Sequence, residues 1–321
     1  MQRRVILASA LLGVSFMLSP AWAQGDYPNR PIKVVVPAAA GGVTDTPARI
    51  VAERMREPLK QPLVIENQGG AGGLIGGEAV KRAAPDGYTL LYVNAATHGL
   101  IPALKKSVPY DAQTDFKPIV MTVRAPMAIV VHRDSPFKML KDLVESLETQ
   151  DKPLNYGSPG PGNTSHLVGL MLADASKGKM QAVHYRGEAP MIQDLLARNI
   201  DFITSNMIRS HVEGGQLRVL ATTGDKRWFA FPEAPTLKES GFNAEYYAWS
   251  GFVAPAATPD AIIKHVNAAA NQALAREDVR KTLMENGFEI IGGRPEVFAK
   301  AIKKYIDSVR AIGRANQIQI D

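Results

Sequence analysis

Short apolar runs alternate with segments of helical periodicity along most of the chain. The run Ile32–Val36 predicts a buried strand, and the segment Ala48–Met55 that follows places Ile50, Val51 and Met55 on one face of a helix. Strands of about four to eight residues that alternate with helices of about ten or more are typical of βαβ units. The pattern therefore predicts an α/β fold with mostly parallel sheets.

The same alternation continues to the C-terminus. It predicts further strands at 62–66, 89–93, 128–131, 154–156, 183–185, 200–204 and 218–222, and helices at 74–84, from Ser135-Pro136 onward, through Leu167–Met171, and at 259–275, 278–285 and 295–311. No long Gly/Ser linker separates the two halves. We therefore expect two lobes, residues 24–124 plus 248–321 and residues 125–247, with the chain crossing near Arg124 and Tyr247.

The first residues have the pattern of a secretory signal peptide. Arg3 and Arg4 precede the 14-residue apolar run Val5–Leu18, and Pro20 and the triplet Ala21–Ala23 follow it. An uncleaved anchor is the alternative, but a membrane-spanning helix needs about 20 apolar residues. We expect cleavage after Ala23 and a periplasmic protein.

Composition narrows the possible functions. The chain has 321 residues, 37 Lys+Arg against 31 Asp+Glu, 45% hydrophobic residues and no cysteine. At about 150 residues per domain this length suggests two domains. The lack of cysteine excludes disulfides, thiolate zinc sites, iron–sulfur clusters and cysteine nucleophiles. Loss of residues 1–23 lowers the net charge from +6 to +4, and the six histidines lack metal-type spacing. We expect no metal, no cofactor and no nucleic-acid partner.

Three glycine-rich segments stand where a strand gives way to a helix: 37–45, 67–73 and 157–165. Such loops line the ligand crevice at the carboxyl ends of the strands in an open α/β sheet. Glycine allows close backbone approach, and the first turn of a helix offers free N–H groups and a partial positive charge. These features favour an anion site, although turn glycines alone are the alternative.

Several polar side chains accompany these loops. Asn163, Thr164 and Ser165 can cap a helix or donate to a ligand. His98 follows the third predicted strand and is expected to face the crevice, either as a polar wall residue or as a ligand contact. Asp45 is expected to cap the helix or to orient water, because a carboxylate repels an anion.

The sequence contains none of the common catalytic or nucleotide-binding motifs that we compared with it. There is no P-loop and no H-E-x-x-H, and Gly70–Gly76 misses the dinucleotide-binding spacing by one residue. Ser158 is not in a G-x-S-x-G elbow, because Tyr156 stands two residues before it. Its pairing with His166 as a nucleophile and base has no geometric support. We therefore assign no catalytic residue, and keep an exported α/β hydrolase acting on a carboxylate, or a periplasmic ligand sensor, as alternatives.

A family resemblance extends over nearly the whole chain after residue 23. It is carried by Tyr27–Ile32, Ala40–Asp45 with Ala48-Arg49, Glu66–Gly73, Ala84–Leu91, Pro109–Asp111 with Asp115-Phe116, Ser158–Gly160 with Ser165–Leu167, Pro235–Leu237 with Glu239–Gly241, and Trp249–Gly251. In these segments the sequence resembles the solute-binding proteins of tripartite tricarboxylate transporters, the TctC or Bug family.

The resemblance implies a monomer with the two-lobed, type II periplasmic binding fold, in which each lobe is a mostly parallel sheet flanked by helices and crossing strands join the lobes. Such a protein closes on a small carboxylate and delivers it to membrane subunits. By position, the implied ligand-binding residues of the first lobe are Ala40, Gly41, Gly42 and Thr44, with Gly72 and Thr97 nearby, and we add Val43 and His98 as further candidates. Those of the second lobe are Ser158, Asn163, Thr164, Ser165, Arg186, Ser205 and Asn206.

Two departures from the family pattern bear on the ligand. Ala38 stands where the family usually has an aromatic residue, which should enlarge the pocket. Ser205 stands where the family often has Asp, which removes a partner for a ligand ammonium. The sequence therefore favours a dicarboxylate, with an aromatic one such as terephthalate as a candidate, over an amino acid.

Overall fold

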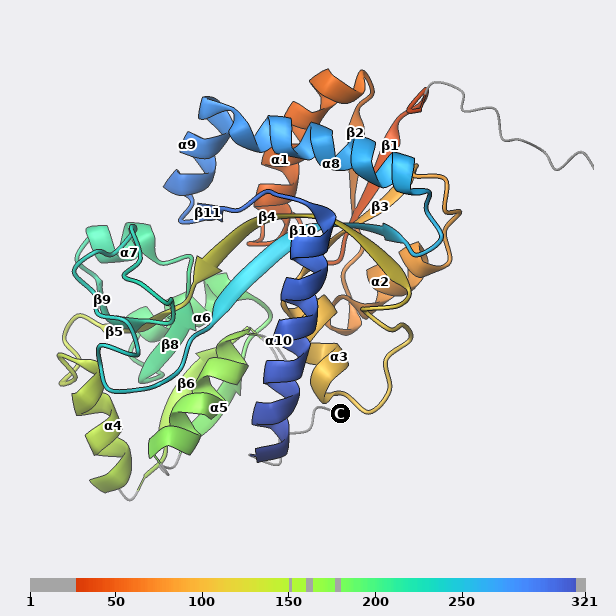
Figure 1. Ribbon diagram of the computed structural model, residues 1–321. Coiled ribbons are helices and arrows are strands. Elements are labelled where there is room, and N and C mark those ends of the chain that lie inside the picture. Colours follow the sequence, from red (N-terminus) through yellow and green to blue (C-terminus); the bar gives the residue numbers. More distant parts are fainter. Residues whose placement is uncertain (1–26, 150–151, 160–163, 177–179, 316–321) are drawn as a thin grey trace, which may run out of the picture.

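The computed structural model describes residues 27–149, 152–159, 164–176 and 180–315. The predicted signal peptide and Asn163 lie outside these residues. Two mixed sheets with helices on their faces form two lobes, and the long strands β4 and β10 run between them (Figure 1).

The first sheet has six strands in the order β11-β4-β10-β3-β1-β2. Their bounds are β1 Ile32–Val36, β2 Leu63–Asn67, β3 Thr89–Asn94, β4 Phe116–Pro126, β10 Tyr247–Pro255 and β11 Glu289–Ile290. β1 pairs in parallel with β2 and β3, whereas β10 is antiparallel to both β3 and β4. β1, β2 and β3, which the apolar runs predicted, are therefore parallel, and β4 runs in the same direction.

The second sheet has five strands in the order β7-β6-β8-β5-β9. Their bounds are β5 Ala128–His132, β6 Leu154–Ser158, β7 Met180–His184, β8 Phe202–Ser205 and β9 Leu217–Thr222. β6 is parallel to β7 and β8, and β5 is antiparallel to β8 and β9. Only β5, the strand that enters this sheet from the first, therefore opposes the other four.

Helices connect and cover the strands. They are α1 Asp45–Leu59, α2 Leu74–Lys81, α3 Ile101–Leu104, α4 Leu140–Thr149, α5 Thr164–Ser176, α6 Glu188–Leu196, α7 Arg209–Glu213, α8 Asp260–Ala275, α9 Glu277–Glu285 and α10 Pro295–Ala315, with the short turns η1 Ala71–Gly73 and η2 Ala96–Leu100. α8 and α10 pack on β4, and α9 packs on α1, so the C-terminal helices return to the first lobe as expected. No helix within the described ranges has the length and apolarity to span a membrane.

The two chain crossings meet at Thr223. Its N–H donates to the Met127 carbonyl at 2.9 Å, and the Met127 N–H donates to the Thr223 hydroxyl at 2.8 Å. That hydroxyl donates to the Tyr246 carbonyl at 2.6 Å. Met127 separates β4 from β5, and Tyr246 precedes β10. One buried threonine thus ties the connection at Met127 to the connection at Tyr246.

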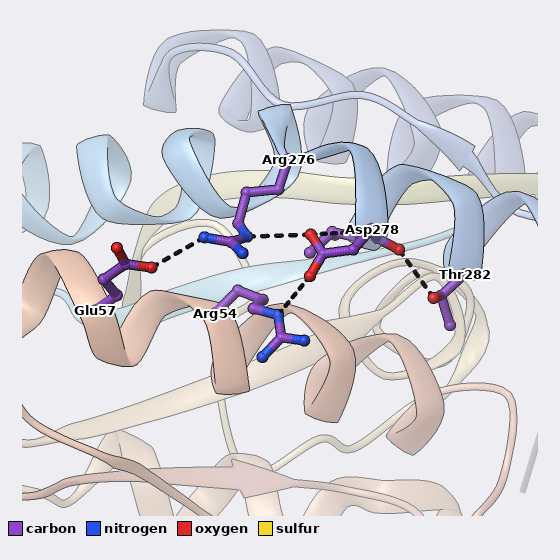
Figure 2. A network of polar contacts seen from close by, with 6 residues as sticks. Arg54, Glu57, Arg276, Asp278 and Thr282 are labelled. Carbon is purple, nitrogen blue, oxygen red and sulfur yellow. Dashed lines mark hydrogen bonds and ion pairs between the residues drawn. The ribbon is translucent and has the colours of Figure 1, made fainter.

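A polar network fixes α1 against the junction of α8 and α9 (Figure 2). Arg276 bonds the Glu57 carboxylate at 2.9 Å and Asp278 at 3.0 Å, and Arg54 bonds the other Asp278 oxygen at 2.9 Å. The Arg276 hydrogen bond holds the pKa of Asp278 below its usual value. Because α1 begins at the first glycine-rich loop, this network supports that loop from the far end of the helix.

Two local predictions are wrong. Ser135-Pro136 does not begin a helix: α4 begins at Leu140, and its first turn is capped when the Asp142 carboxylate accepts the Lys138 and Met139 N–H groups at 2.6 and 3.0 Å. The eleven-residue strand β4 was not predicted, because Pro118 and Arg124 interrupt its apolar run.

Candidate ligand-binding site

A cavity of about 130 Å³ lies between the two lobes. Its walls come from the ends of strands and the starts of helices on both sides: Val43, Thr44, Asn94, Ala95, Ala96, Val123, Met127, Pro159, Ser165, Glu188, Asn206, Ala248, Trp249, Ser250 and Phe288. The predicted residues Val43, Thr44, Ser165 and Asn206 are brought together here, as parts of three different loops.

The first glycine-rich loop reaches the cavity through Thr44, which precedes α1 and is buried. The loop is held from below by Asp45, whose buried carboxylate accepts the Gly41 N–H at 2.8 Å, Arg49 at 2.6 Å and the Asn67 amide at 2.8 Å. Burial alone would raise the pKa of Asp45, but these bonds hold it below 3.8. Asp45 therefore shapes the loop and does not line the cavity.

Asn94, at the end of β3, joins two of the loops. Its side-chain nitrogen donates to the Thr44 hydroxyl at 2.9 Å, and its side-chain oxygen accepts the N–H groups of Ala96 and Thr97 at 3.0 and 2.9 Å. Because the Thr44 oxygen accepts this bond, its own proton is available for a ligand. Sequence analysis missed Asn94, although the strand-end rule applied to β3 identifies it.

The second lobe contributes Ser165 and Asn206. The Ser165 hydroxyl donates to the Thr204 carbonyl at 2.6 Å, so it orders the start of α5 beside β8. The Asn206 side chain is buried and lines the cavity, and it has no hydrogen-bond partner among the described residues. Its amide can thus both donate to and accept from a ligand.

Glu188, the first residue of α6, is an ionisable cavity residue that sequence analysis missed. Its carboxylate accepts a hydrogen bond from the Ser205 hydroxyl at 2.6 Å. Burial raises the pKa of Glu188 to about 7, although the Ser205 bond opposes this shift. Its position after β7, at another strand-to-helix junction, is the signal that could have found it.

The remaining first-loop residues lie beside the cavity and not in its wall. Ala40 and Gly41 are exposed and Gly42 is half-buried. Gly41 has φ +74°, a conformation that glycine adopts without strain. The predicted role of these backbones toward a ligand stays a prediction.

The second glycine-rich loop packs behind this wall. A Cβ on Gly72 would lie 2.9 Å from the Ile101 side chain. Thr97 is buried, its hydroxyl lies 3.3 Å from the Asn94 carbonyl, and its own carbonyl accepts the Tyr110 hydroxyl at 2.8 Å. Gly72 and Thr97 therefore support the loops without reaching the cavity wall.

His98 does not face the crevice, contrary to the prediction. Its ring is fully buried between Tyr110 and Phe116, with ring centroids 5.4 and 4.7 Å away, and neither ring nitrogen has a hydrogen-bond partner among the described residues. Burial lowers the pKa of His98 to about 3. It is a neutral core residue, because the turn η2 directs it away from the strand ends.

In the second lobe, three predicted residues stand apart from the cavity wall. Ser158 is buried and its carbonyl accepts the Tyr185 N–H at 2.8 Å, Arg186 is exposed, and Ser205 lies behind Glu188. Thr164 is the first residue of α5; the prediction for its hydroxyl, like that for Asn163, lies outside what the structure describes.

Aromatic rings close the cavity on the first-lobe side. Trp249 and Phe288 line it, and Trp249 packs edge-on against Phe298 and Tyr305. Tyr246 and Tyr247 do not line it; they line a second cavity of about 320 Å³ beside α10, to which Trp249 also contributes.

A wider cavity of about 460 Å³ adjoins the first and shares Val43, Asn206 and Phe288 with it. Across it, the Trp228 indole donates to the Gly287 carbonyl at 3.1 Å. Trp228 lies in the second lobe, between β9 and β10 in sequence. Gly287 lies in the first lobe, between α9 and β11. This bond joins the lobes at the rim of the cleft.

Two α/β lobes, joined by crossing strands and offering polar groups to one cavity, define a solute-binding protein of the type II periplasmic class. Residues 47–317 match the family described as "Tripartite tricarboxylate transporter family receptor", TctC, and the chain belongs to that family.

Sequence relatives and solved structures agree with this assignment. The chain is 33% identical to a UPF0065 protein encoded in the tcbD–tcbE intergenic region of Pseudomonas sp. strain P51, over 94% of this chain and 90% of that one. It is 31% identical to MatC from Rhodopseudomonas palustris with bound malate, with a TM-score of 0.81 over 89% and 99% of the chains. It is 29% identical to Rpa4515 of the same organism with adipate, with a TM-score of 0.85 over 92% and 99%.

Proposed function

We propose that this protein captures a small carboxylate in the periplasm and passes it, unchanged, to the membrane subunits of a tripartite tricarboxylate transporter. The observation that carries the proposal is the cavity between the lobes, which is lined by Thr44 from the first lobe and by Asn206 from the second. Family membership, the malate and adipate of the two relatives, and the N-terminal pattern support it.

Neutral donors suffice for tight binding. No lysine or arginine occurs among the described residues that line the cavity. A submicromolar Kd needs about −8 to −9 kcal/mol. A hydrogen bond to a charged group contributes about 1.5–3 kcal/mol and a helix N-terminus about 0.3–1 kcal/mol. Five or six such donors would offset association costs of several kcal/mol, and closure of the lobes would exclude water that weakens them.

A dicarboxylate, with terephthalate as the aromatic candidate, is the finer prediction from sequence. The apolar surfaces of Val43, Trp249 and Phe288 suit the hydrocarbon between two carboxylates. The argument from Ser205 was that the site has no carboxylate to pair with a ligand ammonium. This argument needs revision, since Glu188 places a carboxylate 2.6 Å from the Ser205 hydroxyl.

A thermal-shift screen tests the proposal. Purified residues 24–321 are screened against mono- and dicarboxylates that include malate, adipate and terephthalate, and hits are titrated by calorimetry. We expect saturable binding of at least one carboxylate, and mass spectrometry that recovers it unaltered. Failure of all carboxylates, or conversion of a bound ester or amide, overturns the proposal in favour of another function or of the hydrolase alternative.

A further inference from the structure

The electrostatic character of the cavity depends on one residue. Glu188 is the sole ionisable side chain among the described residues that line it. Arg186, two residues earlier, is exposed and is not part of the wall. A ligand with two carboxylates would therefore meet a third carboxylate without a cation in the described wall to balance it.

The geometry at Ser205 fixes one Glu188 oxygen, Oε2, as a hydrogen-bond acceptor. The Met207 N–H donates to the Ser205 oxygen at 3.0 Å, and the Ser205 hydroxyl proton is directed to Glu188 Oε2 at 2.6 Å. The other Glu188 oxygen has no hydrogen-bond partner among the described residues. Because Glu188 lines the cavity, this second oxygen is placed to accept a hydrogen bond from a donor that the ligand supplies.

We propose that Glu188 is a specificity-determining residue that pairs with an ammonium group of the ligand, so that the preferred ligand is a small amino carboxylate. The inference rests on the proposed function: the ligand carboxylate is held by the neutral donors around Thr44 and Asn206, and its ammonium by Glu188. Ser205 keeps the Glu188 side chain oriented toward the cavity. The loss of Asp at position 205 is thus offset by a carboxylate from α6.

The test uses matched ligands with one carbon skeleton. Succinate, malate and aspartate differ only in bearing hydrogen, hydroxyl or ammonium at one carbon, and glutarate and glutamate form a second pair. Each is titrated into wild type, Glu188→Gln and the control Glu213→Gln, which changes an exposed carboxylate at the adjoining cavity. We expect the amino member of at least one pair to bind wild type at least tenfold more tightly. This preference should disappear in Glu188→Gln and remain in Glu213→Gln.

A second measurement requires no variant. Burial leaves Glu188 partly protonated near pH 7, so an incoming ammonium should expel a proton, whereas a dianion should take one up. Calorimetry of wild type in two buffers of different ionisation enthalpy measures the sign, and we expect release. Tighter binding of the diacids, proton uptake, or an unchanged amino preference in Glu188→Gln overturns the inference while leaving the proposed function intact. Failure of every carboxylate to bind overturns both.

Discussion

The Asn94 side-chain amide donates to the Thr44 hydroxyl at 2.9 Å and so joins the loop before α1 to the end of β3. Through this bond, two segments fifty residues apart present one polar surface to the cavity between the lobes. The Thr44 hydroxyl is left with a single proton to donate, and it is directed by the bond that it accepts.

Thr44→Val should therefore weaken ligand binding at least tenfold. The change removes a donor to a charged group, worth about 1.5–3 kcal/mol, and leaves the Asn94 amide without its acceptor. Calorimetry with the best carboxylate from the screen measures the loss. Thr204→Val is the control, because the buried Thr204 hydroxyl has no partner among the described residues and does not line the cavity. Equal affinities of the two variants would refute the role of Thr44.

Asp45→Asn should lower the free energy of unfolding by about 2 kcal/mol at pH 7. This loss is smaller than the loss on breaking a fully buried ion pair, because Arg49 is half-exposed. The folded pKa of Asp45 lies below 3.8. Its contribution is therefore present above the unfolded pKa and is lost as the pH falls through the folded pKa. Urea unfolding at pH 7 and pH 3 should show the gap between the variant and wild type shrinking at pH 3. A gap that is the same at both pH values would contradict this assignment.

Thr223→Val should lower the free energy of unfolding by about 2 kcal/mol, because the buried Met127 N–H and the Tyr246 carbonyl lose the hydroxyl that both bond. The neighbouring Thr222→Val is a matched control, since the Thr222 hydroxyl is buried without a partner among the described residues. Chemical denaturation of both variants measures the difference. If Thr222→Val proves as destabilising as Thr223→Val, the hydrogen bonds of the Thr223 hydroxyl to Met127 and Tyr246 are not what stabilises the connections between the lobes.

Gly287→Ala should hold the lobes apart. A Cβ there would lie 2.8 Å from the Trp228 ring, at the bond that joins the lobes. With saturating ligand, the radius of gyration from X-ray scattering should stay above that of wild type. Gly293→Ala serves as the control, because Gly293 also has positive φ but has open space around its Cβ position. If both variants kept a radius of gyration above that of wild type, backbone strain and not the Trp228 contact would be responsible. If both matched wild type, the prediction would be wrong.

Much of the fold follows from local pattern. β1 coincides with the predicted Ile32–Val36, because four of its five residues are apolar and buried and only Lys33 is exposed. β4 was not predicted, because Pro118 and Arg124 interrupt its local apolar pattern and the strand is defined by its pairing with β10, which shifts register twice.

The site is harder to predict than the fold. Glycine-rich junctions identified Thr44 and Ser165, because a strand end and a helix start are local features. The position of Glu188 depends on its contact with Ser205, seventeen residues later, and His98 turns into the core because Tyr110 and Phe116 surround it. Such contacts are set by the packing of whole elements and leave no local periodicity.

The central claim is that neutral groups of both lobes bind a small carboxylate in the cavity between them. A crystal structure of the protein with its tightest-binding carboxylate tests this most directly. We predict that the ligand carboxylate lies within hydrogen-bond distance of the Thr44 hydroxyl and the Asn206 amide. A ligand bound elsewhere, or a carboxylate held by lysine or arginine side chains, would contradict the account.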